Sequence, residues 1–165
     1  MGCALTITVK TASDLNAALQ RIIAERVDRG VAAATREVAV YAFTEWTGGK
    51  FTWSKYNPND VWSGQSRQSV NIGIGSPDPS FAPDNPGSWP MHESPYPPRD
   101  PFEARFKLEG LPAYVPVYIS DNAPNMAKVE AHTQVAHMAA AFTQAHFKPG
   151  FNWKPVISMS SSVPF

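Results

Sequence analysis

Four histidines are the residues of this chain whose types and spacing could hold a metal ion. His132 and His137 lie five residues apart, so on a helix their side chains diverge by about 140° and cannot share one ion. His137 and His146 are nine residues apart and fall near opposite faces of such a helix. No pattern in the sequence links His92 to the other three. We therefore expect no metal site.

Two glycine-containing motifs begin like catalytic or cofactor signatures and then depart from them. Gly64-Gln65-Ser66-Arg67-Gln68 starts as a nucleophile elbow, but Gln68 stands where the sharp turn needs glycine. Gly73-Ile74-Gly75 precedes Pro77, so the third glycine and the helix of a dinucleotide-binding fingerprint are missing. Glu130 falls within a predicted helix and is interpreted as a solvated glutamate paired with a nearby basic residue. These patterns predict neither an enzyme nor a cofactor.

A long helix is predicted over residues 10–47. Residues 11–14, Thr-Ala-Ser-Asp, supply N-cap side chains, and Gly48-Gly49 follow the last apolar residue. Apolar residues spaced by three and four trace one face: Leu15, Leu19, Ile22, Ile23, Val27, Val31, Ala34, Val38, Ala42 and Trp46. Gly30 indicates a bend or a break into two helices. A helix of about 30 residues is about 45 Å long, longer than a domain of this size is wide, so we expect a neighbouring subunit to cover part of it.

The remaining pattern predicts a small, mostly antiparallel sheet and a second helix. The second helix begins near Pro124 and ends near Phe147, with Ala127, Ala131, Val135, Met138, Phe142 and Ala145 on its buried face. A C-terminal arm of residues 148–165 follows it. Strands are predicted over residues 3–9, 70–75, 103–108 and 114–120. The predicted fold class is α+β, a single domain in which both helices pack on one face of the sheet.

Two segments rich in proline or aromatic residues resist assignment to helix or strand. Residues 77–101 hold nine of the sixteen prolines and predict an extended loop that docks on a partner surface. Aromatic residues gather in and before this loop: Phe51, Trp53, Tyr56, Trp62, Trp89 and Tyr96. They fit either a platform for a sugar or base, or rings that fold back over the core.

Composition excludes several classes of protein. The 165 residues carry 14 basic and 14 acidic side chains, interspersed, so no polyanion-binding arm is indicated. Cys3 is the single cysteine and has no partner for an intramolecular disulfide. No apolar run approaches the length of a membrane span. The start Met1-Gly2-Cys3 matches a lipidation pattern, but we interpret the match as a coincidence, because residues 3–9 suit a plain strand.

Two stretches resemble the tail-completion and neck proteins of tailed bacteriophages, the family that joins the head to the tail. Ser63-Gly64-Gln65-Ser66-Arg67-Gln68-Ser69 matches the family's segment of glycine, arginine and serine before a strand. Residues 119–130, Ile-Ser-Asp-Asn-Ala-Pro-Asn-Met-Ala-Lys-Val-Glu, match its turn with asparagine and proline before a helix that bears glutamate. The resemblance covers about half of the chain.

The resemblance implies a structural virion protein, assembled in the host cytoplasm, that forms a homo-oligomeric ring in the neck. Its implied partners are the head connector or adaptor and the tail-terminator or tail-tube proteins, with passive DNA contact in the lumen and no membrane. Six residues are implied as assembly or structural positions: Ser63, Gly64, Arg67, Asn122, Pro124 and Glu130. We expect Arg67 to pair with a carboxylate of the adjacent subunit, the alternative being a lumen-facing position. Alternative functions are a tail terminator, a minor tail protein or an aromatic-rich ligand-binding module.

Overall fold

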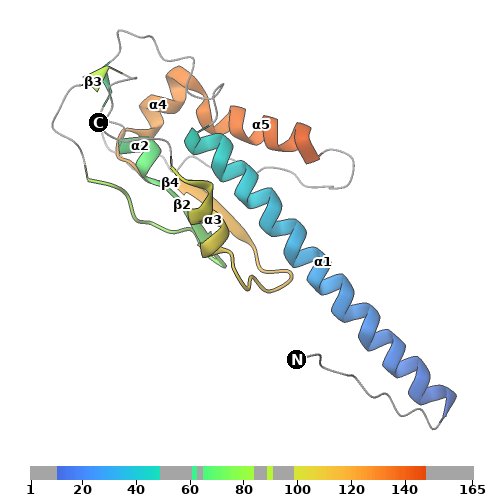
Figure 1. Cartoon of the computed structure of the whole chain (residues 1–165). Helices are drawn as coiled ribbons and strands as arrows, with labels where there is room; N and C mark the ends of the chain where they lie inside the picture. The colour runs from blue at the N-terminus through green and yellow to red at the C-terminus, as the bar shows by residue number, and fades with distance from the viewer. Residues whose placement is uncertain (1–10, 49–60, 63–64, 84–88, 91–98, 148–165) are drawn as a thin grey trace.

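The computed structural model describes residues 11–48, 61–62, 65–83, 89–90 and 99–147, with helices packed around a small antiparallel sheet (Figure 1). The elements follow in the order α1 (Ala12–Gly48), β1 (Val61–Trp62), α2 (Gln65–Gln68), β2 (Val70–Ile74), β3 (Trp89–Pro90), α3 (Pro101–Lys107), β4 (Val117–Asp121), α4 (Met126–Thr133) and α5 (Val135–Phe147). The α+β class and the long N-terminal helix are confirmed. The predicted strand over 3–9, the aromatic residues 51–56 and the arm 148–165 lie outside the described residues.

The helix α1 is continuous over 37 residues, about 55 Å at 1.5 Å per residue. A reciprocal cap starts it: the Asp14 N–H donates to Thr11 Oγ1 over 3.2 Å, and the Thr11 N–H donates to Asp14 Oδ2 over 3.1 Å. The expected break at Gly30 is wrong. A single glycine costs a helix only about 1 kcal/mol, and nothing lies within 4 Å of its Cβ position to force a turn.

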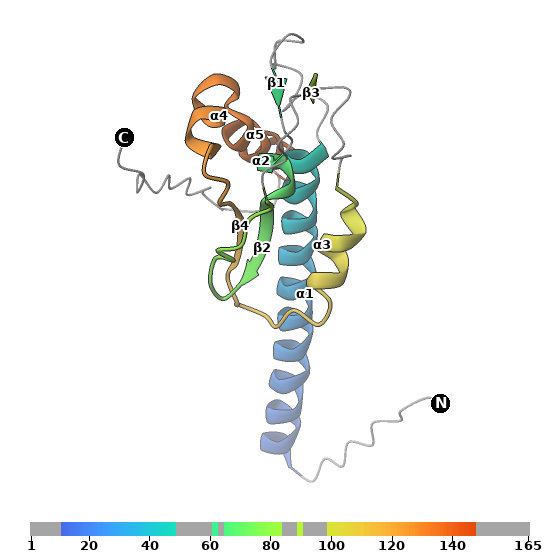
Figure 2. The ribbon, with the colours of Figure 1, turned by 90° about the vertical axis from the view of Figure 1, so that its left-hand side faces the viewer.

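The C-terminal half of α1 forms the centre of the core. Its buried residues are Ala39, Val40, Phe43 and Thr47, whereas the predicted face at Val38, Ala42 and Trp46 is only half-buried. The predicted face is therefore rotated by about one residue, or 100°. The reason is that α3, the strands and α5 all pack on this half of α1, and Phe43 lies in the cluster formed with the strands and α3. Figure 2 shows the N-terminal half of α1 extending beyond all of these elements.

The strands β2 and β4 pair antiparallel, with a register that runs from Val70 opposite Asp121 to Ile74 opposite Val117. Both strands were predicted, β4 with bounds shifted toward the C-terminus. Val70 and Ile72 point into the core on α1. The two-residue strands β1 and β3 form a second small ladder, which ties the segment after α1 to the proline-rich segment. The described residues 77–83 of that segment contain no helix or strand.

The predicted strand over residues 103–108 is wrong, because the chain forms the helix α3 there. Asp100 is its N-cap and accepts a hydrogen bond from the Phe102 N–H over 2.9 Å, and Pro101 occupies the first turn. Ala104 of this helix and its C-cap residue Leu108 are buried, whereas Phe102 and Phe106 are exposed. Capping and the three-to-four spacing of its buried residues outweigh the weak alternation on which the strand prediction rested.

The single helix predicted from Pro124 to Phe147 is also wrong, because the chain divides into α4 and α5 at Gln134. This residue adopts a left-handed conformation with φ of 53°, uncommon for any residue but glycine. Pro124 lies in the turn before α4 and not in the first helical turn. α5 packs along α1, whereas we expected this helix to lie on the sheet. None of the helices that the structure describes is both long and apolar enough to cross a membrane.

Candidate functional site

The two stretches that carry the family resemblance meet at one end of the β2–β4 ladder. Ser66 Oγ, from the short helix α2, donates a hydrogen bond to Asp121 Oδ2 and lies 3.2 Å from Met126 Sδ. The other carboxylate oxygen of Asp121 accepts from the Ala123 N–H over 2.9 Å, which sets the turn into α4. The Ser66 hydroxyl is thus held by the Asp121 carboxylate. The contact joins the two stretches structurally.

Burial raises the pKa of Asp121 to about 6, and the hydrogen bonds from Ser66 and the Ala123 N–H offset only part of the rise. The folded state therefore binds a proton that the unfolded chain, whose aspartates titrate near 3.9, has already released. This contribution to stability is fully present below pH 4 and is lost as the pH rises through 6.

We expect Asp121→Asn to flatten the pH dependence of stability. The unfolding free energy of the wild type should fall relative to the variant by about 2 kcal/mol between pH 4.5 and 7.5, because about two pKa units separate the folded and unfolded states. Urea unfolding of both proteins at each pH measures the difference. Parallel profiles of the two proteins would contradict the assignment.

A row of polar side chains fastens residues 78–82 of the proline-rich segment beside the sheet. From α2 and β2, Gln65 Nε2 donates to the Ala82 carbonyl over 3.0 Å, and Asn71 Nδ2 donates to the Ser80 carbonyl over 2.7 Å. The Ala82 N–H donates in return to Ser69 Oγ over 3.0 Å. A segment without regular structure thereby satisfies its backbone groups through side chains.

Asp78 is the centre of the same attachment. Its carbonyl accepts from Asn122 Nδ2 over 2.7 Å and from Ser120 Oγ over 3.1 Å. Its carboxylate accepts from Ser80 Oγ over 2.6 Å and from Lys107 Nζ over 2.9 Å. The hydrogen bonds from Ser80 and Lys107 hold the pKa of Asp78 far below its usual range. This one residue links β4, α3 and the proline-rich segment.

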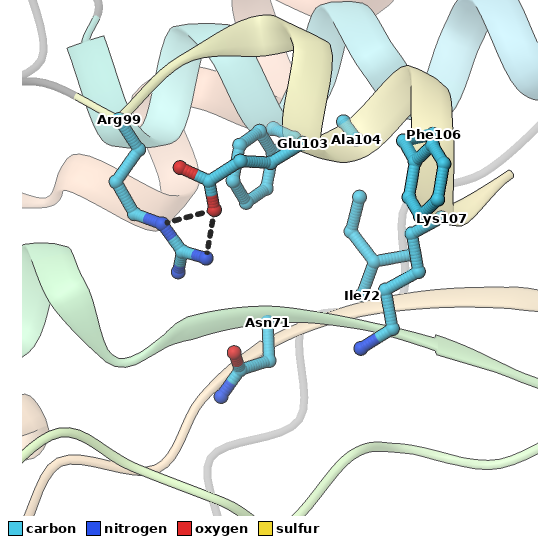
Figure 3. Close-up of a pocket in the computed structure, with 8 residues that line it drawn as sticks. Asn71, Ile72, Arg99, Glu103, Ala104, Phe106 and Lys107 are labelled. Atoms are coloured by element: carbon cyan, nitrogen blue, oxygen red, sulfur yellow. Dashed lines mark hydrogen bonds and ion pairs between the residues drawn. The ribbon is translucent and has the colours of Figure 1, made fainter.

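A hollow of about 420 Å³ lies between α3 and β2, and we call it the α3–β2 hollow (Figure 3). It is lined by Phe43, Asn71, Ile72, Arg99, Glu103, Ala104, Phe106 and Lys107. The Arg99 guanidinium forms one wall: Nε and Nη2 donate to Glu103 Oε2 over 3.1 and 2.5 Å. Nη1 donates to the carbonyls of Gln68 and Val70, which belong to the entry and first residue of β2.

Arg99→Lys is expected to destabilise the fold by about 1.5 kcal/mol, because one ammonium cannot reproduce a planar fork that reaches a carboxylate and two carbonyls. The guanidinium carbon also lies 5.2 Å from the centre of the Phe43 ring, a cation–π contact that favours arginine. Urea unfolding measures the loss. Arg105→Lys is the control, since Arg105 is half-exposed and reaches Glu37 at only 3.7 Å. Equal losses in both variants would contradict a special role for Arg99.

Glu130 is 3% exposed, so its interpretation as a solvated glutamate is wrong. Its carboxylate accepts from the Ala136 N–H over 2.9 Å and from the His137 N–H over 3.2 Å, and it contacts His137 Nδ1. Those two backbone groups belong to the open first turn of α5. Glu130 therefore caps α5 from the preceding helix, at the point where Gln134 turns the chain.

The other predicted site residues that the structure describes do not gather at one place. Ser63 and Gly64 lie outside the described residues. Arg67 is 9% exposed within its own chain, and its pairing with a neighbouring subunit stays a prediction. Asn122 is exposed and holds the Asp78 carbonyl, and Pro124 is exposed in the turn before α4. Among the described residues no three potential metal ligands cluster. The His146 ring stacks on the Tyr41 ring with their centres 4.2 Å apart.

Sequence reasoning missed Arg99 and Asp121 as residues that build the site. A signal existed for the first: Asp100-Pro101 with Glu103 is a helix start, which places Arg99 directly before a first turn. Asp121 precedes Asn122 and Pro124 in a turn pattern that suits an aspartate side chain accepting from the backbone. Comparisons with known proteins add nothing to these observations, since no family model, curated protein or solved structure matches the chain.

Proposed function

We propose that this chain is a structural subunit of a tailed-bacteriophage virion, which forms a ring in the neck between the head connector and the tail. In this role it completes the tail, performs no turnover and needs no cofactor. It assembles in the host cytoplasm and ends in the virion. The family resemblance of residues 63–69 and 119–130 motivates the proposal, and the arrangement of α1 supports it.

The observation that carries the proposal is an apolar row on the projecting half of α1. We call it the α1 ridge: Leu15, Leu19, Ile23 and Val27, each between 46% and 59% exposed. Its members are four residues apart, so each lies about 40° further around the helix axis than the one before it. Figures 1 and 2 both show that this half of α1 stands clear of the other labelled elements. An exposed apolar row of this length marks a contact surface for another protein.

The polar residues of the two stretches support a mechanical role. Ser66, Asp121 and Glu130 use their side chains to join α2, β4, α4 and α5 within one chain. Such bonds fix the turn at the Asp121 end of the ladder and the turn between α4 and α5. A ring subunit needs this stiffness, because small errors in each contact accumulate around a closed ring.

Mass photometry and electron microscopy of the purified protein, alone and with its head connector, test the proposal. We expect ring-shaped oligomers, and mass spectrometry of purified virions should find the chain. A protein that stays monomeric with the connector and is absent from virions would overturn the proposal. A tail terminator or minor tail protein would use the same ridge, and labelling the subunit in the particle separates these positions.

A further inference from the structure

We infer that the α1 ridge of one copy docks into the α3–β2 hollow of the next copy, head to tail. This inference rests on the proposed function, because it names the contact that would build the ring. The occupant of the hollow is thus a second copy of this chain, and the surface it presents is the row of Leu15, Leu19, Ile23 and Val27.

The hollow suits an apolar occupant because its charges are already neutralised. Glu103 pairs with Arg99, and Asp78 pairs with Lys107 over 2.9 Å. Phe43 and Ile72 line the hollow but are only 1% and 2% exposed, so its accessible apolar surface is mainly that of Phe106, which stands at the edge and is 79% exposed. An ionic ligand would have to displace one of the two pairs, whereas aliphatic side chains would cover Phe106 without that cost.

The dimensions of the two surfaces are compatible. A hollow of about 420 Å³ falls in the size range of binding pockets. Successive ridge residues lie about 6 Å apart along α1, so two neighbouring side chains, such as Leu19 and Ile23, can enter together.

The ridge cannot enter the hollow of its own chain. Leu19 and Phe43 belong to one continuous helix and are 24 residues apart, about 36 Å along its axis. Their separation is fixed, so contact between the two surfaces requires two copies. Because the ridge and the hollow are different surfaces, the contact is heterologous: each copy offers both, and repetition gives a closed ring or an open filament.

Two single-site variants test the inference with the full chain. Ile23→Glu places a charge on the α1 ridge, and Phe106→Glu places a charge at the edge of the hollow. Both side chains are exposed, so we expect both variants to fold. Each variant should weaken self-association at least about 100-fold, because a buried unpaired carboxylate is costly. An equimolar mixture should form dimers and nothing larger, since only one intact ridge and one intact hollow can meet. Mass photometry counts the species, and melting curves confirm folding.

Matched controls make each outcome decisive. Ala17→Glu adds the same charge to the opposite side of α1, and Phe102→Glu makes the same change one turn earlier on α3, outside the hollow's lining. Both should assemble like the wild type. If the wild type forms rings and Phe106→Glu does too, or if the mixture gives no dimers, this inference is overturned while the proposed function stands. A wild type that remains monomeric with its connector contradicts both.

Discussion

Glu130→Ala is expected to lower the free energy of unfolding by about 3 kcal/mol, because it strips partners from a buried network. The Ala136 and His137 N–H groups lose the carboxylate that caps the first turn of α5. A cap alone contributes about 1 kcal/mol, and the loss is larger here because the Ala136 N–H is buried and would be left without its carboxylate partner. Thermal unfolding should show a decrease in Tm of about 6 to 12 °C.

Glu109→Ala is the control for this variant. Glu109 is exposed just after α3, so its truncation should change stability by no more than about 0.5 kcal/mol. If Glu130→Ala matches the control, the capping role is wrong. If Glu130→Ala unfolds readily but still assembles at low temperature, the glutamate of this stretch serves the fold and not a subunit contact. The family resemblance at this position would then reflect helix geometry.

Local signals predicted those parts of the fold that depend on neighbours close in the sequence. The cap at Thr11 and Asp14 and the apolar spacing after it gave α1 to within a few residues. The alternation around Ile72 gave β2. The division between α4 and α5 was not predictable, because residues 126–147 keep helical spacing throughout. The Glu130 carboxylate caps the Ala136 amide six residues later, at the turn between the two helices. The spacing of apolar residues does not reveal such a contact.

The buried face of α1 shows a second limit of sequence reasoning. A stripe of aliphatic residues predicts one apolar side, and along residues 15–27 that stripe is present but uncovered. Along residues 39–47 two different elements pack on the helix, so the buried face follows their positions and centres on Phe43. The sequence identifies apolar surface, whereas tertiary packing decides which part of it the chain itself buries. The exposed remainder is the part that suggests assembly.

Gly73→Ala is expected to destabilise the fold by about 3 kcal/mol, at the upper end of overpacking losses. A Cβ there would lie 2.0 Å from the Ser76 carbonyl oxygen and 2.8 Å from the Asp78 nitrogen, both backbone atoms. A shift of that turn away from Gly73 would cost hydrogen bonds, because Asp78 is bound by Asn122, Ser120 and Lys107. Relief of the clash would break the attachment of the proline-rich segment, which limited proteolysis within residues 77–83 would detect.

The same substitution at Gly30 should change stability in the opposite direction. Comparing the two variants shows whether the surroundings of the added methyl group cause the effect. Nothing lies within 4 Å of a Cβ at Gly30, and alanine is favoured over glycine in a helix by about 1 kcal/mol, so Gly30→Ala should stabilise the chain. Both variants add one methyl group to a glycine, so opposite shifts in the urea midpoint must come from the surroundings. Destabilisation at both positions would mean that α1 needs flexibility at Gly30, contrary to a continuous helix that carries its ridge at a fixed distance from the core.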